Sequence, residues 1–175
     1  MKYIKNNLFS VLTLFSSILV SHNSSAHVIV AQRGTLNILN NGVFMVLSLP
    51  ISAFEGVDDD NDGKLSKIEF TKHRSVITNV IHEKVVLKDK NRKLVLEDMM
   101  LSPVTSHQSP QDPVSQLVVM GRYNLTDLLS PLEYTIELFG TTPAEQVLDV
   151  VATRKSDNQK RKIKLTPKNS SVSIF

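Results

Sequence analysis

The chain has 175 residues, no cysteine, 41% hydrophobic residues and a formal net charge of +3 at pH 7. The absence of cysteine excludes disulfides, thiol catalysis and cysteine-ligated zinc or iron–sulfur sites. The composition is that of an ordinary folded domain, and so small a net charge indicates neither a nucleic-acid-binding protein nor a polybasic membrane protein.

The first segment of the chain, Met1–Ala26, has the features of a removable export signal. A basic start precedes the apolar stretch Leu8–Val20, and Ser24 and Ala26 supply the small residues that a cleavage site requires. The apolar stretch is shorter than the ~20 residues that span a bilayer, so it suits a signal better than an anchor. We therefore predict an exported protein, periplasmic or secreted, whose mature chain His27–Phe175 is a single β-rich domain without a transmembrane segment.

The mature chain opens with a predicted β-hairpin. Thr35–Asn40 alternates apolar and polar residues, and Val43–Leu49 follows as an apolar run. The dipeptide Asn41-Gly42 lies between them and favours the positive φ angles of a two-residue hairpin turn. The pattern predicts two antiparallel strands joined at this dipeptide.

Further short segments are rich in β-branched or aromatic residues and are bounded by proline, glycine or polar clusters. The segment Ser102–Pro113 contains three prolines and is predicted to be a loop. Short, regularly punctuated strands are typical of a mainly β fold, and we predict a two-sheet sandwich, immunoglobulin-like in outline. The predicted strands are Val85–Lys88, Lys93–Glu97, Gln116–Leu125, Leu132–Phe139, Val147–Arg154 and Lys160–Leu165.

One segment departs from the β pattern. Between residues 66 and 83, apolar residues recur with the 3.6-residue period of an amphipathic helix, and His73 falls at the centre of the apolar face. We predict one long helix here, with His73 as a buried or half-buried histidine whose nitrogens are hydrogen-bonded. The apolar face consists of Phe70, Val76, Ile77, Val80 and Ile81.

An acidic segment of twelve residues, Asp58–Glu69, leads into this helix. Calcium takes six to eight oxygen ligands, and alternating acidic residues, a glycine at position 6 and a glutamate at position 12 are the pattern of a calcium-binding loop. Gly63 permits the sharp turn that a side chain would obstruct, and Lys64 is expected to contribute only its backbone carbonyl. The predicted calcium ligands are Asp58, Asp60, Asp62, Lys64, Ser66 and Glu69.

This spacing resembles the calcium-binding loop of the EF-hand superfamily, and the resemblance implies Ca²⁺ as the bound ion. The sequence departs from a regular EF-hand in two ways. Pro50 leaves room for only about one turn before the loop, and no second loop of this kind is present to form a pair. A single, unpaired EF-hand loop predicts a local site that binds calcium as weakly as extracellular modules do, with a dissociation constant of about 10⁻⁴–10⁻³ M.

Part of the pattern also has an explanation that needs no metal. Ser66 and Glu69 have the spacing of a helix capping box, in which each side chain accepts a hydrogen bond from the backbone of the other. The two interpretations are compatible, because these two residues hold both roles in an EF-hand loop.

A second resemblance concerns the order of elements along the chain. His27 at the predicted mature N-terminus, the hairpin Thr35–Leu49, the loop Asp58–Glu69 and the hairpin Val85–Glu97 follow one another. This order is similar to that of bacterial extracytoplasmic domains associated with HupE/UreJ-type permeases. The resemblance implies an alternative function, a periplasmic accessory of a membrane permease that handles copper or nickel through His27.

The remaining features favour neither catalysis nor a nucleic-acid partner. The basic stretch of residues 154–168 is predicted to form a charged edge hairpin, which discourages aggregation between sheets. None of the common nucleophile, metalloprotease or phosphate-binding motifs occurs, so we predict that the protein is not an enzyme. The sequence thus predicts an exported calcium-binding protein whose site stabilises or regulates a β-rich interaction domain, with a protein or cell-surface partner.

Overall fold

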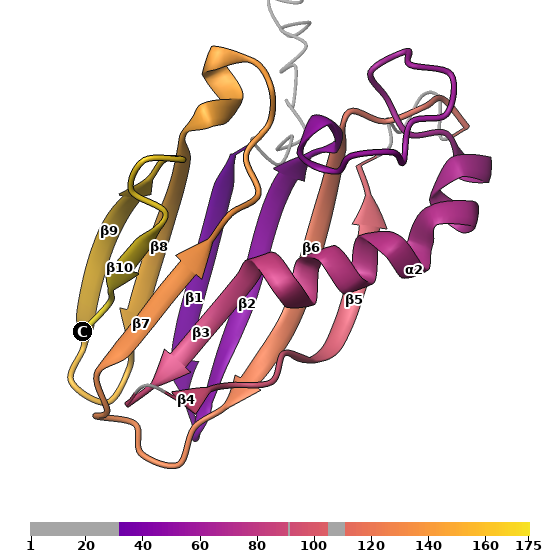
Figure 1. Cartoon of the computed structure of the whole chain (residues 1–175). Coiled ribbons are helices and arrows are strands. Elements are labelled where there is room, and N and C mark those ends of the chain that lie inside the picture. The colour runs from indigo at the N-terminus through magenta and orange to yellow at the C-terminus, as the bar shows by residue number, and fades with distance from the viewer. Residues whose placement is uncertain (1–31, 91, 105–110) are drawn as a thin grey trace, which may run out of the picture.

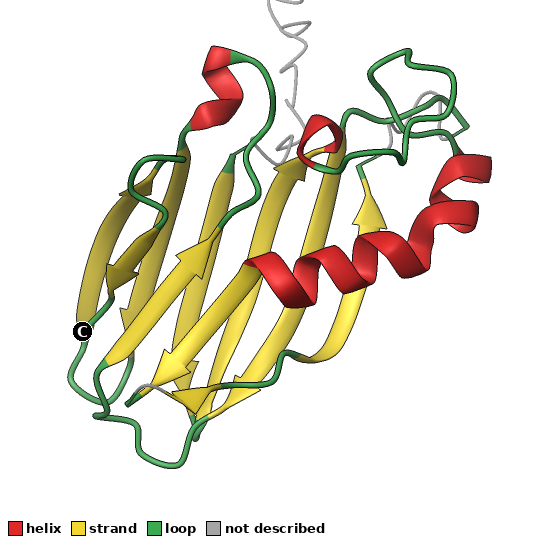
Figure 2. Cartoon of the chain, in the orientation of Figure 1, coloured by secondary structure: helices red, strands yellow, loops and turns green. Residues whose placement is uncertain are grey.

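Two β-sheets and one α-helix make up the described part of the chain, which confirms the predicted β-rich class (Figures 1 and 2). The computed structural model describes residues 32–90, 92–104 and 111–175. The larger sheet has the strand order β5-β6-β2-β1-β8-β9, and the smaller sheet has the order β10-β7-β3-β4. The elements are β1 (Arg33–Leu39), β2 (Gly42–Pro50), η1 (Ile51–Ala53), α2 (Lys67–Lys84), β3 (Val85–Asp89), β4 (Arg92–Lys93), β5 (Glu97–Pro103), β6 (Gln116–Asn124), β7 (Leu132–Ile136), η2 (Pro143–Gln146), β8 (Leu148–Arg154), β9 (Gln159–Leu165) and β10 (Ser171–Ser173).

Strands β1 and β2 form the predicted hairpin, but its turn lies one residue earlier than predicted. Leu39 pairs with Gly42, so the two turn residues are Asn40 and Asn41, with φ angles of 49° and 63°. Positive φ at both central residues defines a turn whose twist matches that of the flanking strands, and asparagine tolerates this conformation. Gly42 is therefore the first residue of β2 and not part of the turn.

The region between β3 and β6 differs most from the prediction. The expected strand Lys93–Glu97 is reduced to the two-residue β4, and the chain then crosses to the larger sheet as β5. Strand β5 extends as far as Pro103, into the predicted loop Ser102–Pro113. A register shift between Glu97 and Met100 interrupts its pairing with β6. Three consecutive apolar residues, Met99–Leu101, also break the polar–apolar alternation by which a strand is recognised in a sequence.

The other predicted strands are present with bounds that shift by a few residues at most. They correspond to β3, β6, β7, β8 and β9, and β8 and β9 form the expected hairpin. Strand β8 also pairs with β1, and this pair is parallel. A parallel partner so distant in sequence leaves no local signal, because the pairing depends on the path of the whole chain.

Helix α2 confirms the predicted helix and ends where β3 begins. In Figure 1 the helix and the smaller sheet lie in front of the larger sheet, and buried apolar residues from all three form one core. Ile77 and Ile81 are fully buried, Phe70 and Val80 are partly buried, and Val76 is 44% exposed although it was expected on the apolar face. We call the side of the larger sheet that meets this core its inner face and the opposite side its outer face.

Candidate metal site

The segment Asp58–Glu69, here called the acidic loop, follows η1 and ends in the first turn of α2. No α-helix precedes it in the described part of the chain, since η1 is a single turn of three residues. Leu65 fastens the loop to the body of the domain, because its N–H donates to the carbonyl of Val114 at 2.7 Å and its carbonyl accepts from the Val114 N–H at 2.9 Å. Leu65 and Val114 are also buried in the core, so the loop is anchored by both backbone and side chain.

The first aspartate organises the turn of the acidic loop. The N–H of Gly63 donates to Asp58 Oδ2 at 2.8 Å, and the N–H of Asp62 donates to Asp58 Oδ1 at 3.2 Å. Gly63 has a φ angle of +78°, a conformation that side-chain-bearing residues rarely adopt. The glycine at position 6 therefore allows the chain to wrap around the carboxylate at position 1, as the sequence pattern predicted.

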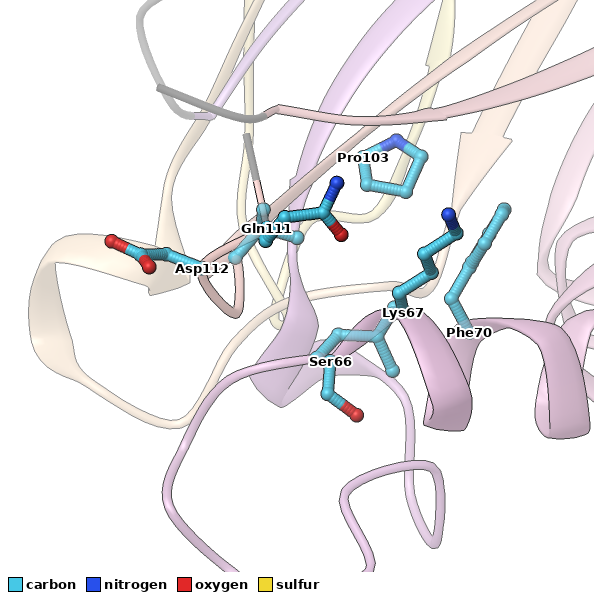
Figure 3. Close-up of a pocket in the computed structure, with 8 residues that line it drawn as sticks. Ser66, Lys67, Phe70, Pro103, Gln111 and Asp112 are labelled. Atoms are coloured by element: carbon cyan, nitrogen blue, oxygen red, sulfur yellow. The ribbon is translucent and has the colours of Figure 1, made fainter. Parts of the chain in front are cut away.

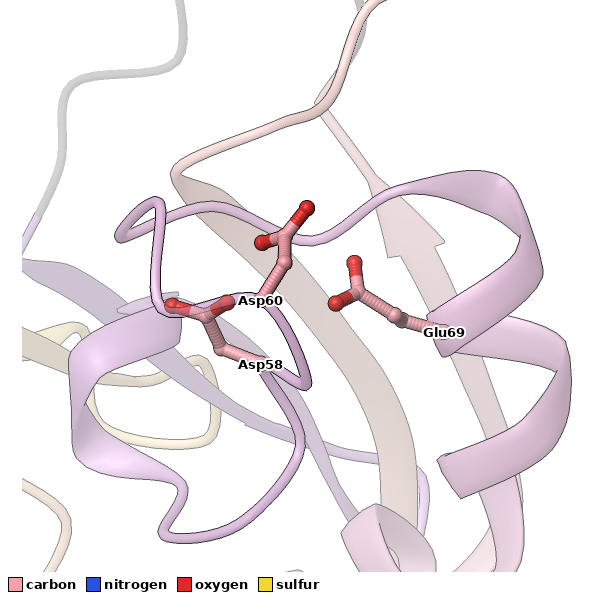
Figure 4. A group of neighbouring side chains, drawn as sticks. All are labelled: Asp58, Asp60 and Glu69. Atoms are coloured by element: carbon pink, nitrogen blue, oxygen red, sulfur yellow. The ribbon is translucent and has the colours of Figure 1, made fainter.

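Three carboxylates converge where the acidic loop meets the helix. One oxygen each from Asp58, Asp60 and Glu69 lies within 4.8 Å of the other two. Figure 4 shows that the aspartates come from the loop and that Glu69 comes from the first turn of α2. These residues occupy positions 1, 3 and 12 of the loop, so the fold brings together residues that are up to eleven positions apart.

Glu69 closes the acidic loop onto the helix. The Ser66 N–H donates to Glu69 Oε2 at 2.8 Å, and the Glu69 N–H donates to Ser66 Oγ at 3.2 Å, which completes the predicted capping box. The other carboxylate oxygen, Oε1, accepts from the N–H of Asp59 at 2.7 Å. Glu69 is only 6% exposed, and one carboxylate thus ties the start of the loop to the start of the helix.

The carboxyl groups of Glu69 and Asp60 are perturbed in opposite directions. The Ser66 hydroxyl, with the backbone N–H groups of Ser66 and Asp59, holds the pKa of Glu69 below its ordinary value. The Asp62 N–H acts to lower the pKa of Asp60, but desolvation and the neighbouring carboxylates outweigh it and raise that pKa. The raised pKa of Asp60 reflects desolvation together with the crowding of negative charge, and a bound cation relieves the crowding.

The other predicted ligands, Asp62, Lys64 and Ser66, take part in hydrogen bonds or face the solvent at the same loop. Oδ1 of Asp62 accepts from the N–H of Lys64 at 2.8 Å, and the Lys64 side chain is exposed to solvent. Ser66 is the N-cap of the helix, with its hydroxyl engaged by the backbone of Glu69. Of the four predicted carboxylate ligands, the structure brings together Asp58, Asp60 and Glu69.

A second layer of contacts, on the outside of the acidic loop, was not predicted from the sequence. Lys72 Nζ lies 2.8 Å from Asp59 Oδ2, and His73 Nε2 lies 3.0 Å from Asp59 Oδ1. These two contacts are the largest causes that lower the pKa of Asp59. His73 is mostly buried, as predicted, but its partner is the loop aspartate, and no periodicity indicates that contact.

A pocket of about 270 Å³ lies beside the acidic loop, and Figure 3 shows the side chains around it. Helix residues Lys67 and Phe70 line one side, and Pro103 and Gln111 line the other. This volume is at the small end of the range for ligand sites. None of the three converging carboxylates lines the pocket, although the predicted ligand Ser66 does.

Comparison with known proteins gives no match to a protein-family model or to a curated protein. Within the described ranges, no helix is long and apolar enough to cross a membrane. The predicted export signal Met1–Ala26 and His27, the residue of the copper or nickel alternative, both lie outside the described residues.

Proposed function

We propose that the protein is an exported calcium-binding protein with one EF-hand-type site, and that the ion stabilises a β-sandwich interaction domain. The observation that carries this proposal is the convergence of Asp58, Asp60 and Glu69 around the turn at Gly63. These carboxylates supply hard oxygen ligands of the kind that calcium prefers. Asp62, Ser66 and the Lys64 carbonyl complete the proposed ligand set.

The chemistry of the donor set favours calcium over other ions. All proposed ligand atoms are oxygens, whereas copper and zinc sites in proteins usually include nitrogen or sulfur ligands. Magnesium requires a compact octahedron at 2.0–2.1 Å, as is typical of its protein sites, and it keeps several waters. An eleven-residue span between first and last ligand suits the larger and more adaptable coordination sphere of calcium.

We infer that calcium acts as a local staple, meaning that it stabilises the acidic loop and the start of α2 only. It does not act as a switch that opens a groove elsewhere in the domain. The backbone hydrogen bonds between Leu65 and Val114 hold the loop against the segment that precedes β6. A second, paired EF-hand loop is therefore not needed to hold it. The core that surrounds Leu65 is continuous with the rest of the domain. Loss of calcium is therefore expected to loosen the loop and the first turn of α2 while the β core persists.

Titration calorimetry of the purified chain tests the proposal directly. We expect one calcium per chain, a much weaker signal with magnesium, and a loss of calcium affinity of at least about tenfold in Asp58→Asn and in Glu69→Gln. Asp112→Asn is the matched control, because Asp112 is an exposed aspartate outside the acidic loop. Calcium binding that survives both loop substitutions refutes the proposed site, and stoichiometric copper binding that survives them favours the alternative at His27.

Export is tested separately from metal binding. Intact-mass measurement of the protein from its native host is expected to give a chain that begins at His27, since Ser24 and Ala26 provide the cleavage pattern. A membrane-bound chain that retains Met1–Ala26 contradicts export by a cleaved signal and leaves the calcium site unaffected.

A further inference from the structure

The outer face of the six-stranded sheet carries exposed apolar side chains. The inner face packs against the core, whereas Phe44 and Val46 of β2 are 43% and 36% exposed and Met100 of β5 is 58% exposed. In β2 they alternate with the buried residues Val43 and Met45, which places them on the opposite side of the sheet. Contiguous exposed apolar residues with a polar rim are typical of interaction sites.

The strand register arranges these side chains in two rows across all six strands. Partners in adjacent strands point to the same face, so each row can be followed from one sheet edge to the other. The first row, from β9 to β5, is Lys162, Val151, Thr35, Val46, Met120 and Met100. The second row is Lys160, Thr153, Asn37, Phe44, Arg122 and Glu97.

Each row thus has a positive charge at the β9 edge, and the second row has a carboxylate at the β5 edge. The Lys160 side chain is exposed, and the Glu97 side chain is 39% exposed. Glu97 accepts a hydrogen bond from Asn124 Nδ2 at 2.7 Å and lies 3.5 Å from Arg122 NH2, so its position on this face is fixed. The two edges of the outer face therefore carry opposite charges at the same level of the sheet.

We propose that the outer face binds the same face of a second copy of this chain, related by a two-fold axis that runs between β1 and β2 parallel to the strands. Such an axis places β9 of each copy against β5 of the other. Lys160 of each copy then lies opposite Glu97 of the other copy, which gives two equivalent ion pairs. It also places Met120 against Val151 and Met100 against the aliphatic stem of Lys162. A two-fold interface requires this self-complementarity.

The charge pattern selects this axis over the perpendicular one. A two-fold axis across the strands places β9 of one copy against β9 of the other, which opposes Lys160 and Lys162 to lysines. Like charges in opposition are unfavourable, whereas the strand-parallel axis pairs opposite charges. Both axes keep the strands of the two sheets aligned, as face-to-face packing requires, so the charge pattern is what distinguishes them.

The size of the face sets the expected affinity. Six strands at a spacing of about 4.8 Å make a face about 25–30 Å wide. The standard size of a specific protein–protein interface is about 800 Å² per partner, and we expect an interface limited to this face to be no larger. We therefore expect a reversible dimer with a dissociation constant in the micromolar range, independent of calcium because the acidic loop lies elsewhere.

Sedimentation of the full chain over a range of concentrations, with and without calcium, is the first test. We expect a monomer–dimer equilibrium, and we expect Val46→Lys to raise the dissociation constant at least about tenfold, since a charge is then buried at the centre of the interface. Val95→Lys is the matched control, because Val95 is a 69% exposed valine between β4 and β5. A chain that remains monomeric at its highest soluble concentration overturns the proposal.

A charge exchange tests the orientation of the two copies. Lys160→Glu and Glu97→Lys are each expected to weaken the dimer, and the double variant is expected to restore it, because the pair is reversed on both sides. Melting temperatures of all three variants establish that each is folded. A folded double variant that is no better than the single variants overturns the proposed axis.

Thiol labelling identifies what covers the face. The chain has no cysteine, so Val46→Cys introduces its only thiol. We expect the labelling rate to fall as the protein concentration rises, because the second copy shields the thiol. A labelling rate that is independent of protein concentration overturns the proposal. If that rate is fast, the face is exposed to solvent. If it is slow even at high dilution, a segment of the same chain covers the face.

Discussion

The acidic loop and the β core are stabilised by different interactions, although they meet at Leu65. The core is formed by fully buried apolar side chains from both sheets and α2, which need no partner beyond one another. The acidic loop is held by hydrogen bonds from its own backbone to the carboxylates of Asp58, Asp62 and Glu69. One region is stable through burial, and the other depends on how well crowded negative charges are compensated.

This difference explains why an ion can act on one region and leave the other unchanged. Hydrophobic burial is insensitive to calcium, whereas a cation adds direct attraction to each carboxylate that it contacts. The two regions share the Leu65–Val114 bridge, so calcium bound in the loop stabilises the whole domain only through mass action on the folded state. Substitutions in the two regions should therefore respond to calcium in different ways.

The largest expected effect is in the core. Leu87 is fully buried in β3, and Leu87→Ala should lower the free energy of unfolding by about 2–5 kcal/mol, both with calcium and with a chelator. Leu129→Ala removes the same atoms from a 63% exposed position and should cost far less. Urea denaturation measures both values. A Leu87→Ala loss that disappears when calcium is added would contradict the separation of core and loop.

Removal of calcium should have the next largest effect. At a hundredfold excess over its dissociation constant, a ligand of the folded state adds ~2.7 kcal/mol, which corresponds to a rise of several degrees in melting temperature. Glu69→Gln should abolish that rise, because it removes the carboxylate at position 12. Glu83→Gln is the matched control, since Glu83 is an exposed glutamate on the same helix.

Hydrogen exchange locates the effect of calcium in the structure. We expect added protection only between Val57 and His82, where the loop and most of α2 lie. Protection that spreads to the strands β8 and β9 would indicate a switch and not a staple. An unfolded calcium-free chain would show that the β core is not independent of the acidic loop.

A smaller effect is expected at the helix cap, where it separates the capping role of Ser66 from its proposed role as a ligand. In the presence of a chelator, Ser66→Ala should lower the free energy of unfolding by about 1 kcal/mol, because Oγ caps the N–H of Glu69. Ser75→Ala on the exposed side of the helix should change it by only a few tenths of a kcal/mol. A larger loss for Ser66→Ala in calcium than in chelator would support ligation by the hydroxyl.

Features encoded by nearby residues were predictable from the sequence. The turn at Gly63 and the capping box of Ser66 and Glu69 follow from fixed spacings, because the interacting groups are within a few positions of one another. The first hairpin was predicted for the same reason, although the choice between Asn40-Asn41 and Asn41-Gly42 as its turn was wrong. Both dipeptides tolerate positive φ, and only the strand register distinguishes them.

Features that depend on the packing of distant segments were not predictable. Strand β5 was missed because its three consecutive apolar residues, Met99–Leu101, obscure the alternation of its two faces. The parallel pairing of β1 with β8 depends on the path of the whole chain. The contact of His73 with Asp59 depends on the angle at which the loop leaves the helix. The two rows of side chains on the outer face can be recognised only from the pairing register of all six strands.

The smallest expected effect is the pH dependence of the acidic loop, and it tests the balance of charges there. The folded-state pKa of Glu69 is lowered, so its contribution to stability is present at neutral pH and is lost as the pH falls through that pKa. The folded-state pKa of Asp60 is raised, so its contribution is favourable at low pH and is lost as the pH rises through that pKa.

These two contributions have opposite signs, so Glu69 and Asp60 of the calcium-free loop should shift in opposite directions from ordinary carboxyl groups. Carbon-detected NMR of the side-chain carboxyls, recorded in a chelator, should show Glu69 titrating below an ordinary glutamate and Asp60 titrating above an ordinary aspartate. Calcium should lower the pKa of Asp60, because the cation favours its charged form. Identical Asp60 titrations with and without calcium would mean that the ion does not contact this carboxylate, and would restrict the site to the remaining ligands.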